Sequence, residues 1–203
     1  MNNRIDFIES WLSEMPENLG NIELFAIIEY NIKERSNLTK PQDLGSGYKK
    51  ISGTQTLYYW YEKDGEIVIG VELSVKQQTL IVNGVAKNPS YKNKPPYATD
   101  LYKKVLDDNS SIRVMSDIYL TNNSINVWKR LINSGVTVSV YDNKVPGQSF
   151  KKINSVEELE KYIGYIEYEY QRYQFVLTSK DEILAEVTSI FNTRRLRELS
   201  GLL

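Results

Sequence analysis

The clearest alternation of apolar and polar positions lies in residues 56–86. Residues 56–62 are aromatic, and in residues 66–75 Ile67, Ile69 and Val71 alternate with a second set of residues that includes Glu72. A period of two is typical of a β-strand. Residues 63–65 and 76–78 resemble turns, and residues 79–86 form a third apolar stretch. The pattern predicts an antiparallel meander of three strands.

Helices and strands alternate after this meander. Apolar residues recur every three or four positions in residues 97–106, and again on the face that carries Ile125 and Trp128. This spacing predicts two helices, the second beginning at the capping residues 121–124 and ending at Gly135. The remaining predicted elements are strands at residues 112–120, 136–141 and 166–178 and a short acidic helix at residues 156–163.

The two ends of the chain are less regular. Residues 5–12 place apolar side chains on one helical face, whereas residues 22–32 fit a helix or a strand equally well. Residues 180–203 have helical spacing. The order of elements predicts a mixed α/β fold, an α+β mixed sheet with flanking helices. We expect one domain over residues 1–178 and a C-terminal helical extension over residues 179–203.

Composition excludes several kinds of chemistry. The chain has 203 residues with no cysteine and no histidine. A Cys/His zinc site, a disulfide framework and every nucleophilic system that depends on histidine are therefore excluded. The acidic residues 107–111 lack the spacing of a calcium loop, so we predict a helix-ending turn there and no metal site. Residues 45–50 are rich in glycine and are predicted to be a loop.

Charge and hydropathy describe the expected environment. The formal net charge is −1, and 41% of the residues are hydrophobic. These values favour a globular protein and argue against one that acts on nucleic acid through bulk basicity. No apolar run is long enough to span a bilayer, and residues 1–6 lack the apolar core of a signal peptide. We expect a soluble, cytoplasmic protein with no membrane contact.

Tyrosine is in excess. The chain has 15 tyrosines, many of them within residues 58–61 and 162–173. One interpretation is a strand-rich structure, because tyrosine suits a half-buried pleated surface. The other is a surface on which a ligand or nucleic-acid bases stack.

Residues 88–101 form the most distinctive run of the chain. The run reads Asn-Pro-Ser-Tyr-Lys-Asn-Lys-Pro-Pro-Tyr-Ala-Thr-Asp-Leu, and it follows the apolar stretch at residues 79–86. It is similar to the pattern V-x-P-x-Y-R-G-K-G-hydrophobic-A-T-x-L. With the strand and helix predicted at residues 111–131, it resembles the GNAT acyltransferases. The divergent form is similar in style to GNAT-like proteins encoded by bacteriophages.

The resemblance implies a site for acetyl-CoA. In the family, the splayed edge of the fourth strand receives the pantetheine arm, and a loop at a helix N-terminus binds the pyrophosphate through backbone amides. On this chain, the backbone amides of Val85 and Ala86 would hold the thioester carbonyl, and Gly84 is expected to mark a bulge. The other cofactor-binding candidates are Lys92, Lys94, Tyr97, Ala98 and Thr99.

Two positions depart from the family pattern. Pro96, with Pro95 beside it, replaces the central glycine of the phosphate loop, and each proline removes an N–H donor. Trp128 stands four residues after Ser124, where the family often has a tyrosine acid, so Trp128 is expected to anchor the core. Glu72 is either a base or a side chain on the solvent face of a hairpin. The catalytic candidates are Tyr119, Ser124 and Glu72, with Tyr141 as a substitute acid.

Basic residues are concentrated in the centre of the chain. Residues 90–152 carry ten basic and five acidic side chains, a net charge of +5. This segment is either an anion site or a solvated basic face. A second cluster, formed by Arg194, Arg195 and Arg197, lies among leucines near the C-terminus. It fits either a helix with matched charges or a helix that docks a protein partner.

The sequence leaves two functions open. The first is an acyl-CoA-dependent N-acyltransferase with a degenerate motif and no metal. The second is a GNAT-like protein that has lost catalysis and acts by binding, for instance a phage-encoded inhibitor or accessory factor in the host cytoplasm that acts on a host or viral protein. The geometry around Pro95 and Pro96 should discriminate between the two hypotheses.

Overall fold

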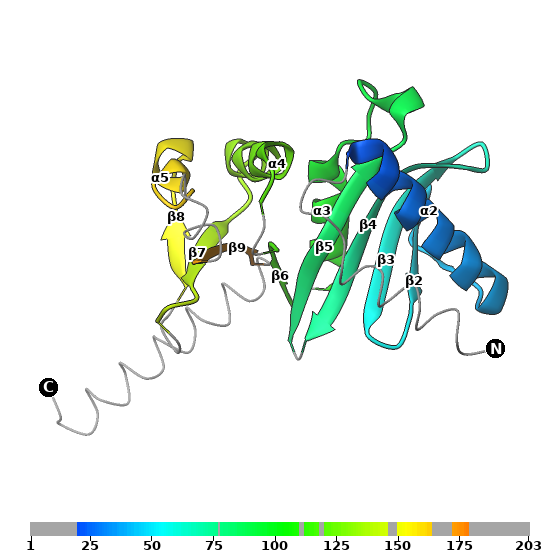
Figure 1. The fold of residues 1–203 in the computed structure, drawn as a ribbon, viewed down its shortest axis with the longest axis horizontal. Helices are drawn as coiled ribbons and strands as arrows, with labels where there is room; N and C mark the ends of the chain where they lie inside the picture. Colours follow the sequence, from blue (N-terminus) through cyan, green and yellow to red (C-terminus); the bar gives the residue numbers. More distant parts are fainter. Residues whose placement is uncertain are drawn as a thin grey trace, which may run out of the picture.

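The computed structural model describes residues 20–76, 78–109, 112–117, 120–145, 150–163 and 172–178 (Figure 1). Within them, nine strands form one sheet in the order β1-β2-β3-β4-β5-β6-β9-β7-β8. The strands are β1 (Gln42–Asp43), β2 (Tyr48–Ser52), β3 (Thr56–Lys63), β4 (Glu66–Lys76), β5 (Thr79–Lys87), β6 (Arg113–Met115), β7 (Val138–Asp142), β8 (Lys151–Ile153) and β9 (Tyr173–Leu177).

Helices flank this sheet. They are α2 (Asn21–Leu38), α3 (Ala98–Asp108), α4 (Asn122–Asn133) and α5 (Val156–Glu160), with a short 3-10 helix η1 (Pro89–Tyr91). Strands β5 and β6 are parallel and the other neighbouring strands antiparallel. The predicted mixed α/β class is therefore confirmed.

The predicted meander is confirmed as β3, β4 and β5. Asp64 and Gly65 join β3 to β4 with φ angles of 52° and 81°, as a two-residue hairpin turn with two positive φ angles requires. The prediction of a loop over residues 45–50 is wrong for its second half, because Tyr48 begins strand β2. The ring of Tyr48 packs edge-on against Tyr61, with 5.1 Å between the ring centroids.

Helix α2 resolves the ambiguity of residues 22–32. Phe25, Ile28 and Ile32 are buried against one face of the sheet, whereas Ile22 is 65% exposed. The helix contains more apolar residues than its buried face needs, which is why its period was ambiguous. A Cβ atom at Gly70 of β4 would lie 2.7 Å from Ile28 Cγ2, so this close approach of helix and sheet depends on glycine.

The opposite face of the sheet packs against α3 and α4. Leu101 and Val105 of α3 and Trp128 of α4 are buried in one core with Phe175 of β9. The ring of Trp128 lies 5.7 Å from that of Phe175 and 6.0 Å from that of Tyr102. Trp128 is 1% exposed, which confirms its predicted role as a core anchor.

The aromatic stretch at residues 58–61 belongs mostly to the interior. Tyr58 and Trp60 pack toward α2, and Tyr59 packs in the core on the opposite face. All three are at most 2% exposed. The interpretation of these aromatics as strand residues is therefore confirmed, and their rings do not form a stacking surface.

Two further predicted strands are described in part. Among the described residues, the strand expected at residues 112–120 is seen as β6, and the one expected at residues 166–178 as β9. Strand β8 was not predicted, because Lys151–Ile153 has little apolar alternation. The helices expected at residues 5–12 and 180–203, and with them the C-terminal extension, lie outside the described residues. Within the described part, no helix has the length and apolar character needed to cross a bilayer.

Replacing Trp128 by alanine should destabilise the fold, because the cavity left between α3, α4 and β9 cannot collapse onto a rigid sheet. We expect the free energy of unfolding to fall by about 3–5 kcal/mol, measured by urea denaturation. Val75→Ala, at a strand position that is 45% exposed, is the matched control and should change it by less than about 0.5 kcal/mol. Equal losses for both variants would contradict the described core.

Candidate functional site

The centre of the candidate site is the edge of β5 that faces β6. The two strands pair only at Thr79–Arg113, Leu80–Val114 and Ile81–Met115. Strand β6 ends at this last pair, whereas β5 continues to Lys87 (Figure 1). The part of β5 beyond β6 contains Val85 and Ala86, the residues whose amides were predicted to hold a thioester carbonyl.

A bulge interrupts β5 next to this edge. Glu72 of β4 pairs with Gly84 and Leu73 with Val82, which leaves Asn83 as the extra residue. The bulge expected at Gly84 is therefore confirmed, one position away. A Cβ atom at Gly84 would lie 3.0 Å from Leu24 of α2, so the bulge lies directly beneath the helix.

The side chain of Glu72 is buried rather than solvated. It is 7% exposed; its Oε1 accepts a hydrogen bond of 3.1 Å from Asn83 Nδ2, and its Oε2 one of 3.5 Å from Asn31 Nδ2 of α2. The interpretation of Glu72 as a solvent-facing side chain is wrong, because α2 covers that face of the hairpin. Glu72 remains a candidate base in a pre-organised polar cluster.

Tyr58 belongs to the same cluster. Burial raises the pKa of Tyr58 to about 12, and the Glu72 carboxylate adds to this shift while Arg35 opposes it. The guanidinium carbon of Arg35 lies 5.3 Å from the centroid of the Tyr58 ring. At neutral pH, Tyr58 is therefore a protonated phenol beside a carboxylate.

Most backbone N–H groups of the loop between β5 and α3 are either absent or hydrogen-bonded within the loop itself. Pro89, Pro95 and Pro96 have no N–H group. Five other N–H groups donate to acceptors within the same segment. They are Ser90 N to Asn88 Oδ1, Tyr91 N to Asn88 O, Lys92 N to Pro89 O, Lys94 N to Tyr91 O, and Tyr97 N to Asp100 Oδ2. An anion at this loop therefore finds few N–H groups to bind.

Lys87 lies inside the loop and binds carbonyl oxygens. Its Nζ donates to the carbonyl of Lys94 and, over 2.7 Å, to that of Pro96. It also lies 4.6 Å from the centroid of the Tyr97 ring. Burial lowers the pKa of Lys87, and the Asp100 carboxylate acts in the opposite direction. The ammonium group thus stabilises the loop by binding two of its carbonyl oxygens.

Asp100 occupies the N-terminus of α3. Its carboxylate accepts the Tyr97 amide over 2.7 Å, as the third helical residue does in a capping box. A helix N-terminus attracts anions through its dipole and unpaired amides. Here the chain supplies that anion itself. Together with the occupied amides, Asp100 makes this loop a poor fit for the pyrophosphate of acyl-CoA.

The other candidate residues are distributed around this loop. Tyr97, Ala98 and Thr99 lie at the start of α3, where Tyr97 is 39% exposed. Lys92 and Lys94 are exposed on the loop. Val85 packs against the core on the α3 side, whereas Ala86 packs toward α2.

Ser124 and Tyr141 form no described contact with Glu72. Thr121 caps α4: its Oγ1 accepts the Ser124 amide, and the Ser124 hydroxyl donates to the Thr121 carbonyl over 2.7 Å. Tyr119 lies outside the described residues. The ring of Tyr141 packs against Phe150, with 5.5 Å between the centroids.

Part of the basic central segment is neutralised by α5. Lys129 pairs with Glu160 over 2.6 Å and Lys151 with Glu158 over 3.4 Å. The acidic stretch at residues 107–111 is confirmed as a helix end at Asp107 and Asp108, where Asp108 binds Lys50 and the Tyr59 hydroxyl, both over 2.6 Å. The described residues contain no group of side chains that could hold a metal ion.

Sequence reasoning missed the roles of Lys87 and Asp100. Asp100 was detectable, because an acidic residue three positions after a helix cap is a known capping signal. Lys87 carried no such signal, since nothing in a strand-ending lysine predicts that its ammonium group turns into the following loop.

Comparisons with known proteins were made for the sequence and for the fold. No protein-family model and no curated protein sequence matches the chain. The structure is similar to the ribosomal-protein-S18-alanine N-acetyltransferase from Escherichia coli, at 12% identity over 78% of this chain and 88% of that one, with a TM-score of 0.37. It is also similar to a putative acetyltransferase of the GNAT family from Bacteroides thetaiotaomicron, at 12% identity over 70% and 71% of the chains, with a TM-score of 0.36.

Stability at alkaline pH tests the cluster around Glu72. The pKa of Tyr58 is about 12 in the folded chain and about 10 in an unfolded one, so the unfolded state loses its proton first and stability falls as pH rises above about 10. Between about pH 9 and about pH 11, Tyr58→Phe should lose about 1 kcal/mol less unfolding free energy than the unaltered chain.

Urea denaturation at the two pH values measures this difference. Tyr30→Phe, which alters a side chain that is 48% exposed, is the control and should lose as much as the unaltered chain. If Tyr58→Phe behaves like Tyr30→Phe, the buried cluster is wrongly described.

Proposed function

We propose that this chain is a GNAT-like protein that acts by binding a partner and does not transfer acyl groups from acetyl-CoA. The observation that supports this most directly is the filled loop before α3, where Lys87 binds two carbonyl oxygens and Asp100 caps the helix. Both groups belong to the chain and are therefore always present. A pyrophosphate would have to displace the Asp100 carboxylate and draw Lys87 away from the carbonyl oxygens.

The electrostatics of the loop support the same conclusion. The Asp100 carboxylate accepts a hydrogen bond at the helix N-terminus and would repel an incoming phosphate there. The Lys87 ammonium group that could attract a phosphate already has two acceptors. Breaking charged hydrogen bonds costs about 1.5–3 kcal/mol each, which weakens any ligand that needs the loop to open.

The partner that we propose is a protein. The resemblance to phage-encoded GNAT-like proteins favours a host or viral protein, on which the chain would act as an inhibitor or accessory factor. Residues 179–203, with Arg194, Arg195 and Arg197 among leucines, are the predicted docking segment. They lie outside the described residues, so this part of the proposal rests on sequence alone.

An N-acyltransferase is the second candidate. It is favoured by the extension of β5 beyond the end of β6 and by the bulge at Asn83, which lies beside the buried carboxylate of Glu72. In this case the strand amides of Val85 and Ala86 would face the acyl group, and Glu72 would act as the base. Tyr119 and Ser124 would be the remaining candidates for proton transfer.

Binding of acetyl-CoA distinguishes the two functions. We expect no saturable shift of the Ala98 and Thr99 backbone amides in a nuclear magnetic resonance titration with acetyl-CoA up to about 5 mM, which corresponds to a binding free energy at α3 weaker than about −3 kcal/mol. We also expect no acetylation of a panel of amines and N-terminal peptides. Saturable binding together with turnover would overturn the binding-only proposal and favour the acyltransferase.

A charge-removing variant tests whether the Asp100 carboxylate is what prevents acetyl-CoA from binding at α3. Asp100→Asn removes the negative charge at α3 and keeps the shape of the side chain. If the carboxylate excludes phosphates, this variant should bind acetyl-CoA more tightly than the unaltered chain. Thr99→Ser, at the neighbouring position, is the control. An identical lack of binding in Asp100→Asn would contradict the electrostatic explanation.

A further inference from the structure

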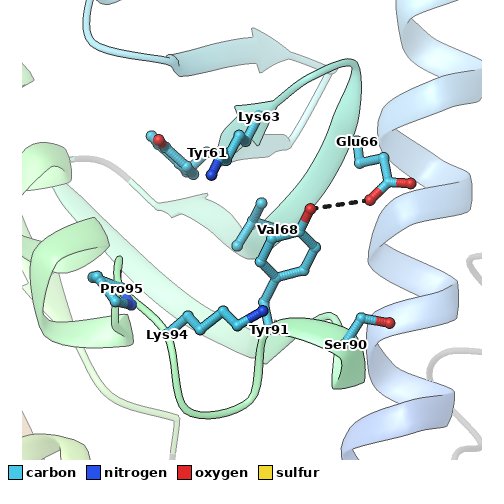
Figure 2. A pocket seen from close by; sticks show the side chains of 8 residues that line it. All are labelled: Tyr61, Lys63, Glu66, Val68, Ser90, Tyr91, Lys94 and Pro95. Atoms are coloured by element: carbon cyan, nitrogen blue, oxygen red, sulfur yellow. Dashed lines mark hydrogen bonds between the residues drawn. The ribbon is translucent and has the colours of Figure 1, made fainter.

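A separate pocket lies between the loop that precedes α3 and the β3–β4 hairpin (Figure 2). It has a volume of about 540 Å³. None of its lining residues belongs to α3, α4 or β6. The lining residues are Tyr61, Lys63, Glu66, Val68, Ser90, Tyr91, Lys94 and Pro95. We call it the hairpin pocket.

The charged groups of the hairpin pocket are predominantly positive. Lys63 and Lys94 are both exposed, and neither forms a salt bridge within the described part of the chain. The Lys94 ammonium group lies 5.7 Å from the centroid of the Tyr91 ring. Glu66 is the one acidic lining residue, and its carboxylate already accepts the Tyr91 hydroxyl over 3.2 Å. Two lysines without a carboxylate partner thus face one cavity.

The walls of the hairpin pocket combine polar and apolar surface, and the apolar part is held in place. Tyr61 packs edge-on against Tyr48 behind it, and Val68 is buried in the sheet. Tyr91 is fixed by its hydrogen bond to Glu66 and belongs to η1, whose first turn is capped by the Asn88 side chain. Figure 2 shows the rings of Tyr61 and Tyr91 and the side chain of Pro95 around the same space. The cavity is therefore pre-formed.

We propose that the hairpin pocket binds a small organic anion with a planar ring. The anionic group, a phosphate or a carboxylate, lies between the ammonium groups of Lys63 and Lys94, and the ring packs against Tyr61 and Pro95. A volume of about 540 Å³ is in the range of small-molecule sites, which combine apolar walls with a few polar groups. The proposal goes beyond the binding function above and does not depend on it.

The charged group and the planar ring of the proposed ligand each follow from a different feature of the pocket. Charge attraction at an open site is weak on its own, so a free inorganic anion binds poorly. A planar ring adds apolar contact with Tyr61 and with the pyrrolidine ring of Pro95. A cation is disfavoured, because the one carboxylate in the wall already has a partner and two ammonium groups lie beside it.

Four probes test this inference by titration calorimetry and by amide shifts of residues 61–68 and 90–95. Adenosine 5′-monophosphate carries a ring and a phosphate, and 4-hydroxyphenylacetate a ring and a carboxylate. Adenosine lacks the charge, and inorganic phosphate lacks the ring. At least one of the two ring-bearing anions should bind with a dissociation constant below about 1 mM, and adenosine and phosphate at least about tenfold more weakly.

Variants locate the binding. Lys63→Gln and Lys94→Gln should each raise the dissociation constant of the ring-bearing anion by about threefold to fivefold, as expected for ion pairs open to solvent. Lys76→Gln, an exposed lysine at the far end of β4, is the matched control and should leave the affinity unchanged. These are surface substitutions, and all three variants should therefore fold.

Three results would overturn the inference. One is the absence of saturable binding for both ring-bearing anions up to about 10 mM, which would correspond to a free energy weaker than about −3 kcal/mol. Another is equal binding of adenosine and its monophosphate, and the third is equal affinity in the Lys63→Gln and Lys76→Gln variants. The test of acetyl-CoA reads different residues, so each proposal can fail without the other.

Discussion

The limited pairing of β5 with β6 is the constraint on which the rest of the structure depends. Strand β5 pairs with β4 along its whole length but with β6 at only three positions. Where β5 pairs with β6, the sheet is continuous and covers the core around Trp128. Beyond Ile81, the edge of β5 has no described strand partner on the β6 side. This part contains the bulge at Asn83 and leads into the loop before α3. Glu72, Lys87, Asp100 and the hairpin pocket all lie in or beside this part.

The chain fills this part of the structure with its own charged groups. Lys87, the last residue of β5, turns its ammonium group to the carbonyl oxygens of the loop, and Asp100 caps the helix that follows. On the α2 face, Glu72 is satisfied by Asn31 and by the bulge residue Asn83. Because buried charges are stable only when paired or hydrogen-bonded, these contacts fix the loop and the bulge in one arrangement and leave the hairpin pocket open beside them.

The sequence predicted what depends on periodicity and missed what depends on distant contacts. Strands β3 to β5 and helices α3 and α4 follow from local spacing, and Trp128 follows from its place on an apolar helical face. The solvent-facing interpretation of Glu72 was wrong, because alternation in a hairpin does not reveal that a helix containing Asn31, 41 residues earlier, covers that face. The two prolines indicated a loss of N–H donors, whereas the position of Lys87 depends on how the loop folds back.

The central proposal is that the Asp100 carboxylate, which accepts the Tyr97 amide, excludes a phosphate group from the N-terminus of α3. The most direct test is a nuclear magnetic resonance titration of the whole chain with inorganic pyrophosphate, following the backbone amides of Ala98 and Thr99 in the first turn of α3. The account predicts that these two amides show no saturable shift at concentrations up to about 10 mM, a free energy weaker than about −3 kcal/mol. A saturable shift at both amides would contradict it.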